Sequence, residues 1–200
     1  MKLKGILFVL SGPSGTGKGT VCSEILNRED KLTISVSATT REKRLGETDG
    51  ETYYYVTKDN FLDMIDKGEM LEYAVYNGNY YGTPKAMVEN LLNDGKDVLL
   101  EIEPQGALQV KKMFPEAALV FLVPPSMAEL KHRLITRGRE SNEEIAERIA
   151  AAKWELEQAD KYTILIENDD FEECVCNVLA YIDSKRKERN KINSLINEKV

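Results

Sequence analysis

The sequence predicts an α/β protein of three layers (α/β/α), in which helices cover both faces of a central parallel sheet. Two observations predict this class. Five apolar runs have the length of strands and are separated by helical stretches, as in a sheet built from βαβ units. The first run also leads directly into a glycine-rich loop and a helical pattern, which is the order of a phosphate-binding loop. Two long insertions between the runs predict two additional small lobes.

The five expected strands are apolar segments of the kind that a parallel sheet buries on both faces. They are residues 5–10, 32–37, 97–102, 118–123 and 162–166. Ligands of such sheets bind beyond the carboxyl ends of the strands. Polar residues gather after the first three of these runs, at 11–20, 37–44 and 101–105. The sequence therefore predicts one ligand-binding edge.

The loop after the first strand reads Gly-Pro-Ser-Gly-Thr-Gly-Lys-Gly-Thr over residues 12–20, which fits the pattern G-x-x-x-x-G-K. Its glycines let successive backbone N–H groups face phosphate oxygens, and Lys18 adds a positive charge for the β- and γ-phosphates. Gly19 replaces the Ser or Thr that usually ligates Mg²⁺, and Thr20 follows one position later. The loop predicts a nucleoside triphosphate site and leaves the phosphoryl acceptor open.

The first insertion, about residues 38–95, is too long for a simple crossover. It contains a tyrosine run at 53–55 and a helical pattern at 59–67 that Gly68 ends. Pro84 is expected at the first position of another helix, which Gly95 stops. We expect a small lobe of mixed strands and helices.

The second insertion follows the fourth strand. Capping-box patterns beginning at Ser126 and Ser141 predict two helices, with Gly138 between them. Several arginines on or beside these helices are suited to holding a transferring phosphoryl group, although solvation is the ordinary alternative for any one of them. They are Arg133, Arg137, Arg139 and Arg148. The basic run 185–189 on the last helix is expected to be a solvated face.

Composition narrows the function classes. The chain has 200 residues, of which 42% are hydrophobic and 30% charged, as in an ordinary globular protein. Its net charge of −7 argues against nucleic acid or an anionic membrane as a main partner. No apolar run is long enough to span a membrane or to act as a secretion signal. Three cysteines without a C-x-x-C pair fit a reducing compartment, so we expect a cytoplasmic protein.

The first insertion also carries residues suited to a nucleoside monophosphate. Guanine presents two adjacent donors, which a carboxylate such as Glu72 would accept, whereas adenine presents an acceptor at N1. Ser37 and Thr83 would complete the reading of the base edge, unless Ser37 only ends a strand and Thr83 only caps a helix. The phosphate would be held by Arg41, Arg44, Tyr53 and Tyr81, through guanidinium and phenol hydrogen bonds.

Taken in order, these motifs resemble the guanylate kinase family. The matching segments cover nearly the whole chain and are residues 11–18, 36–47, 50–53, 72–74, 78–83, 105–106, 137–139, 148 and 168–170. The resemblance implies transfer of a phosphoryl group from ATP to GMP, giving ADP and GDP by direct in-line displacement. It also implies Mg²⁺, bound with ATP, as the cofactor.

The resemblance further implies three parts and a set of site residues. The core would be residues 1–37, 96–125 and 160–200, the GMP-binding lobe 38–95, and a small helical lid 126–159. Catalytic residues would be Lys18, Arg41, Arg137 and Arg148, and Glu101 would approach the metal through water. The ATP site would comprise Gly12, Pro13, Ser14, Gly15, Thr16, Gly17, Lys18, Gly19, Thr20, Arg133, Arg137 and Asn168. The GMP site would comprise Ser37, Arg41, Arg44, Tyr53, Glu72, Tyr81, Thr83 and Glu103.

The chain departs from the family pattern at two further positions, with Glu103 where the family often has Asp and Pro104 where it has an aromatic or another residue. One alternative function is that of a guanylate-kinase-like module that binds protein partners without catalysis, which the intact Lys18 and loop glycines disfavour. Another is a kinase for AMP or UMP, which Glu72 disfavours. The use of dGMP and the oligomeric state are left open.

Overall fold

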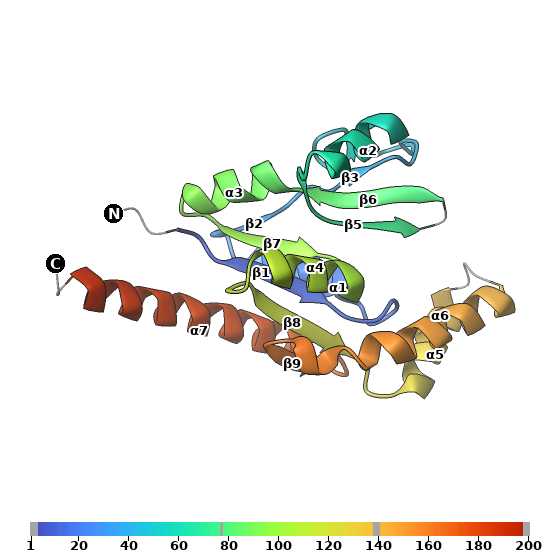
Figure 1. Cartoon of the computed structure of the whole chain (residues 1–200). Coiled ribbons are helices and arrows are strands. Elements are labelled where there is room, and N and C mark those ends of the chain that lie inside the picture. The colour runs from blue at the N-terminus through green and yellow to red at the C-terminus, as the bar shows by residue number, and fades with distance from the viewer. Residues whose placement is uncertain (1–3, 77, 138–140, 198–200) are drawn as a thin grey trace.

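The computed structural model describes residues 4–76, 78–137 and 141–197. Its central sheet is parallel and has the strand order β2-β7-β1-β8-β9 (Figure 1). These strands are β1 (Leu7–Ser11), β2 (Leu32–Ile34), β7 (Asp97–Glu101), β8 (Ala118–Val123) and β9 (Ile164–Glu167). All five predicted strands are present, and the predicted α/β class is confirmed.

The second predicted strand, 32–37, is too long, because that run is divided between two sheets. Ser35 N–H still donates to Leu99 O of β7 at 3.0 Å. Three residues later, Ala38 pairs with Gly82 in a second sheet. The chain therefore leaves the core sheet at Val36 and Ser37.

Successive side chains of β1 point to opposite faces of the core sheet, and both faces are apolar. Phe8 and Leu10 pack with helices α1 (Lys18–Arg28) and α7 (Phe171–Asn197). Leu7 and Val9 pack with the opposite pair, α3 (Lys85–Asn93) and α4 (Pro104–Met113). The phosphate-binding loop emerges between these two apolar layers.

The first insertion forms the expected mixed lobe, which lies above the core in Figure 1. Its sheet has the order β4-β3-β6-β5, formed by Tyr54–Tyr55, Ala38–Thr39, Asn79–Pro84 and Met70–Tyr76. Phe61 of α2 (Lys58–Asp66) is buried in this lobe. Pro84 was predicted to open a helix, but it pairs with Met70 and ends β6, so α3 begins one residue later. The buried residues of α3, Val88 and Leu92, pack on the core.

The second insertion forms α5 (Met127–Arg137) and α6 (Asn142–Leu156), followed by the short helix η1 (Ala159–Lys161). Ser126 Oγ accepts from Glu129 N–H at 3.0 Å, and Ser141 and Glu144 form a reciprocal capping box, so both predicted helix starts are confirmed. Gly138 and Arg139 lie outside the described residues. Leu130 and Leu134 of α5 lie against Gly15, so this helix packs on the phosphate-binding loop.

The basic run 185–189 of α7 was predicted to be solvated, and this is wrong for its two arginines. Arg186 Nε donates to Asp97 Oδ2 at 2.7 Å, and Arg189 donates to Asp97 Oδ1 at 2.8 Å. Arg186 also pairs with Glu29. The helical spacing of 182, 186 and 189 continues the buried stripe of α7, so these arginines face the sheet. Neither α7 nor any other helix in the described ranges has the length and apolar character to cross a membrane.

Candidate active site

The loop between β1 and α1 is fixed by side chains from two parts of the chain. Thr16 Oγ1 donates to Pro13 O at 2.8 Å, and Asn168 Nδ2 donates to Thr16 O at 2.6 Å. Gly17 has φ of 90°, and a Cβ there would lie 2.7 Å from Asn168 Nδ2. Asn168, which was predicted to contact ATP, thus supports the loop backbone in this structure.

Lys18 lies across the loop, where its Nζ donates to Gly12 O at 2.6 Å and to Pro13 O at 3.2 Å. Burial lowers the pKa of Lys18, and the nearby carboxylates of Glu103, Glu155 and Glu101 oppose that shift. The ammonium group is therefore held against the backbone of the loop by two carbonyl groups.

Glu101 ends β7 and faces the start of α1. A Cβ at Gly19 would lie 3.4 Å from Glu101 Oε1, which is ordinary van der Waals contact. Glu101, which was predicted to approach the metal through water, thus lies beside Gly19, the position at which other phosphate-binding loops carry the hydroxyl that ligates Mg²⁺.

The second insertion contacts the loop through α6. Arg148 donates to Ser14 Oγ, which brings this predicted catalytic arginine to the loop. Glu155, one of the last residues of α6, accepts from the backbone of Ser14 and interacts with Lys18; burial raises its pKa. Sequence reasoning did not single out Glu155. Glu155 follows Ala152 by three residues and so lies on the apolar stripe of α6. A carboxylate on a buried helix face was the signal in the sequence that could have identified it.

Two other lid arginines were predicted to act on ATP. Arg133 donates to Asn168 O at 2.9 Å and to Glu129 Oε1 at 2.8 Å. Beside it lies a hollow of about 380 Å³, lined by Gly15, Gly17, His132, Arg133 and Thr136. Arg137 ends α5, and its side chain lies outside the described residues.

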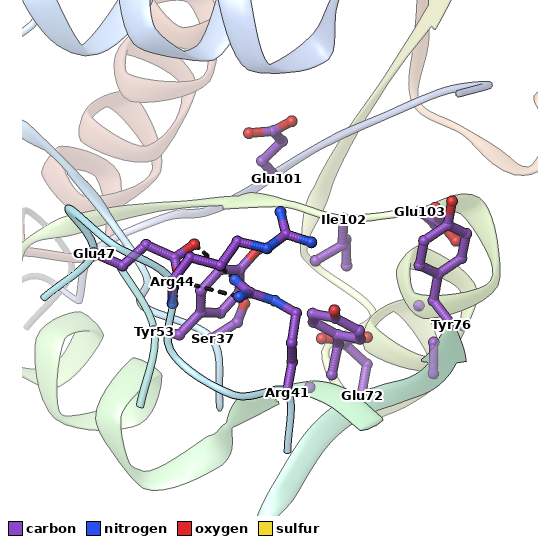
Figure 2. Close-up of a pocket in the computed structure, with 14 residues that line it drawn as sticks. Ser37, Arg41, Arg44, Glu47, Tyr53, Glu72, Tyr76, Glu101, Ile102 and Glu103 are labelled. Atoms are coloured by element: carbon purple, nitrogen blue, oxygen red, sulfur yellow. Dashed lines mark hydrogen bonds and ion pairs between the residues drawn. The ribbon is translucent and has the colours of Figure 1, made fainter. Parts of the chain in front are cut away.

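A cavity of about 430 Å³ lies between the lobe and the core (Figure 2). It receives side chains from the second sheet, from the segment after β3, and from the end of β7. Its lining comprises Ser37, Arg41, Arg44, Glu47, Tyr53, Glu72, Ala74, Tyr76, Tyr81, Gly82, Glu101, Ile102, Glu103 and Gly106. All residues predicted for GMP are thus in the lining, except Thr83.

Glu72 supplies a buried carboxylate to this cavity and is 5% exposed. Thr83 lies behind it, where its hydroxyl donates to Glu72 Oε1 at 2.7 Å. Burial raises the pKa of Glu72 to about 7, and the hydrogen bonds from Thr83 oppose the shift. The Thr83 hydroxyl therefore orients the carboxylate.

The cavity is also lined by Arg41 and Arg44, whose guanidinium groups are drawn in Figure 2. Arg41 NH2 pairs with Glu47 Oε1 at 2.7 Å, and Tyr55 OH donates to Glu47 Oε2 at 2.8 Å. Hydrogen bonds from Arg41 help to lower the pKa of Glu47 to about 2. Arg41 also lies over the ring of Tyr53, 5.6 Å from its centroid. Glu47 was not predicted as a site residue, although it stands in the same short motif as Arg41.

The parallel sheet, the glycine loop with its lysine, and the two hollows define a nucleotide-binding protein of the phosphate-binding-loop class. Comparison with known proteins specifies the family. A family model described as guanylate kinase matches residues 4–185.

Two relatives named guanylate kinase, from Oceanobacillus iheyensis and Bacillus subtilis, are 50% and 49% identical to this chain. Each alignment covers 96% of this chain, with 93% and 95% of the respective relative. A crystal structure of guanylate kinase from Anaplasma phagocytophilum superposes with a TM-score of 0.73 at 32% identity, covering 92% of this chain and 87% of that one.

The chain therefore belongs to the guanylate kinase family. This confirms the predicted family, the enzyme class of phosphotransferase and the activity of that family, which is ATP-dependent phosphorylation of GMP to GDP.

Proposed function

We propose that this chain binds GMP in the 430 Å³ cavity and ATP at the Gly12–Thr20 loop, and transfers the γ-phosphoryl group between them. The observation that carries the proposal is the buried Glu72 carboxylate in a cavity that Arg41 and Arg44 also line. One cavity thus offers an acceptor pair for a base and a cationic pair for a phosphate.

Base selectivity is assigned to Glu72. An ionised carboxylate accepts from both N1–H and the amine of guanine, while it repels the N1 lone pair of adenine. Thr83 already uses its hydroxyl on one carboxylate oxygen, which fixes the rotamer of Glu72. Ser37, which also lines the cavity, is assigned to the same base edge.

The phosphate of GMP is assigned to Arg41 and Arg44. Phosphoryl transfer depends on positioning and on neutralising the charge that spreads over the transferring oxygens, and it needs no protein nucleophile. Lys18 and Arg148, which meet at the loop, are placed to neutralise that charge from the donor side. Closing the lid over both substrates excludes water as a competing acceptor.

The residues present fit a Mg²⁺ ion that arrives with ATP. Mg²⁺ is usually held by one or two carboxylates, several waters and substrate phosphates. Glu101, beside Gly19 at the loop, would hold it through water. The ion would supply neutralisation of the phosphate oxygens during transfer.

The direct test measures ADP release from ATP with GMP, dGMP, AMP and UMP supplied in turn. Release with GMP, and none with AMP or UMP above the rate of ATP alone, is expected. GMP binding without ADP release would favour the non-catalytic module. Faster release with AMP than with GMP would overturn the role of Glu72.

A further inference from the structure

Two elements limit the position of the Glu72 carboxylate. The first is β6, the neighbouring strand of its own sheet, from which the Thr83 hydroxyl donates a hydrogen bond. The second is the first turn of α4, a helix of the core. A Cβ at Gly106 would lie 2.5 Å from Glu72 Oε2 and 3.2 Å from its Cδ, and real Cβ atoms essentially never approach another atom within 3.0 Å. The carboxylate therefore lies in a space that exists only because residue 106 has no side chain.

The backbone does not explain this glycine. Gly106 is the third residue of the ten-residue helix α4, and it is not among the glycines with positive φ. Glycine is a poorer helix former than alanine. The space occupied by the Glu72 carboxylate is the reason that the structure offers for a glycine at this position.

One turn further along α4, Gln109 attaches the strand that carries Glu72. Gln109 Oε1 accepts from Tyr73 N–H at 3.2 Å, and its Nε2 donates to Tyr73 O at 2.9 Å. β5 is an edge strand of the second sheet. Its outward backbone groups at Tyr73 are thus satisfied by a side chain of the core helix, which fixes the residue next to Glu72.

We propose that α4 forms the second half of the guanine site, in which Gly106 sets the depth of the Glu72 carboxylate and Gln109 fixes its position along β5. Both are positioning residues, because they act on guanine through Glu72. This inference rests on the proposed function of Glu72 and adds that selectivity for guanine depends on the core as well as on the lobe.

The test is a double-mutant cycle between residues 106 and 72, with GMP and AMP as acceptors. Gly106→Ala is expected to raise KM for GMP about tenfold or more and to reduce the preference for GMP over AMP, with kcat within about twofold of the parent. Glu72→Asp withdraws the carboxylate by one methylene group. In that background, adding Gly106→Ala is expected to change KM by less than about twofold.

A purely structural role of Gly106 predicts a different result, namely the same loss in both backgrounds. That result, or an unchanged KM in the single variant, would overturn the inference. If Gly106→Ala does not fold, Gln109→Leu provides the second test. It is expected to raise KM for GMP while kcat and the melting temperature stay near those of the parent.

Lys112→Ala is the matched control on the same helix, since Lys112 is exposed and lies outside the cavity lining. It is expected to change neither KM nor selectivity. Failure of the inference can be separated from failure of the proposed function by Glu72→Gln. If that variant keeps the parent's selectivity, Glu72 does not read the base. If it loses selectivity while the variants at 106 and 109 keep theirs, only the role of α4 is wrong.

Discussion

The two ends of strand β7 carry acidic residues with opposite roles. Asp97, at the amino end, is 5% exposed and accepts from Arg186, Arg189 and the backbone N–H of Ile6. Glu101, at the carboxyl end, lines the cavity and faces Gly19 of the loop. One edge of the parallel sheet therefore uses charge to attach α7, and the other uses charge to face ligands. Activity and stability should accordingly respond to changes at different edges.

The largest effect is expected for the loop lysine at the ligand edge. Lys18→Ala should lower kcat by about 10²–10³-fold or more, because it removes a preorganised cation from the phosphate oxygens. Initial rates with saturating ATP and GMP measure the loss. Near-parental turnover would refute the assignment of ATP to this loop. Circular dichroism of the variant should match that of the parent, since Lys18 bonds only loop carbonyls among the contacts described.

At the opposite edge, Asp97→Ala should reduce the free energy of unfolding by about 3–5 kcal/mol, because it leaves the partly buried Arg186 and Arg189 without their shared acceptor. Urea denaturation followed by circular dichroism measures the change. KM for GMP should be unchanged at temperatures where the variant is folded. A loss of GMP affinity with unchanged stability would contradict the separation of the two edges.

This edge is also where sequence reasoning failed. A run of Lys, Arg and Glu on a helix is usually solvated, and nothing in the pattern 185–189 says that Arg186 and Arg189 meet Asp97. Their pairing spans about half the chain, and it depends on where α7 crosses the sheet. Asp97 was predicted to begin a buried strand. A charged residue in such a strand needs a partner, but the sequence does not show which residue that partner is.

The ligand edge was easier to predict, because a parallel sheet brings the carboxyl ends of its strands together whatever the packing details. The loop at 12–20 and the acceptor residues near 37–53 and 72–83 follow from that rule and from motif order. Glu155 and Glu47 were not predicted as site residues, and Gly106 was matched only as part of a family motif. Their contacts, to Ser14, Arg41 and Glu72 respectively, are not visible in a sequence pattern and appear only in the folded chain.

An intermediate effect is expected for the base-reading carboxylate. Glu72→Gln should lower kcat/KM for GMP by about 10–100-fold, since one oxygen acceptor becomes a donor that opposes a guanine N–H. The preference for GMP over AMP should fall with it. Parallel kcat/KM measurements with both acceptors give the ratio, and an unchanged ratio would assign base reading to another residue.

A smaller effect is expected from pH. Burial raises the pKa of Glu72 to about 7, and guanine requires the ionised carboxylate, so binding GMP below that pH should release a proton. As the pH falls through 7, the protonated form accumulates and KM for GMP should rise, approaching about tenfold per pH unit. The Glu72→Gln variant is the control, because it lacks the titration of Glu72 and retains those of the GMP phosphate, near pH 6, and of Glu101 and Glu155, whose pKa values burial raises. The same pH dependence in both proteins would assign the titration to the substrate.

The smallest effect is expected for an exposed ion pair. It joins opposite charges, as Asp97 does with Arg186 and Arg189, but it is much less buried. Arg28 of α1 contacts Glu172 of α7 at 2.5 Å, with the two side chains 34% and 59% exposed. Water solvates both groups when the pair breaks, so Arg28→Ala should leave the urea midpoint within experimental error. This variant and Asp97→Ala remove contacts to the same helix. A comparable loss in both would show that any charge pair attaches α7, whereas a loss in Asp97→Ala alone assigns the attachment to the buried cluster.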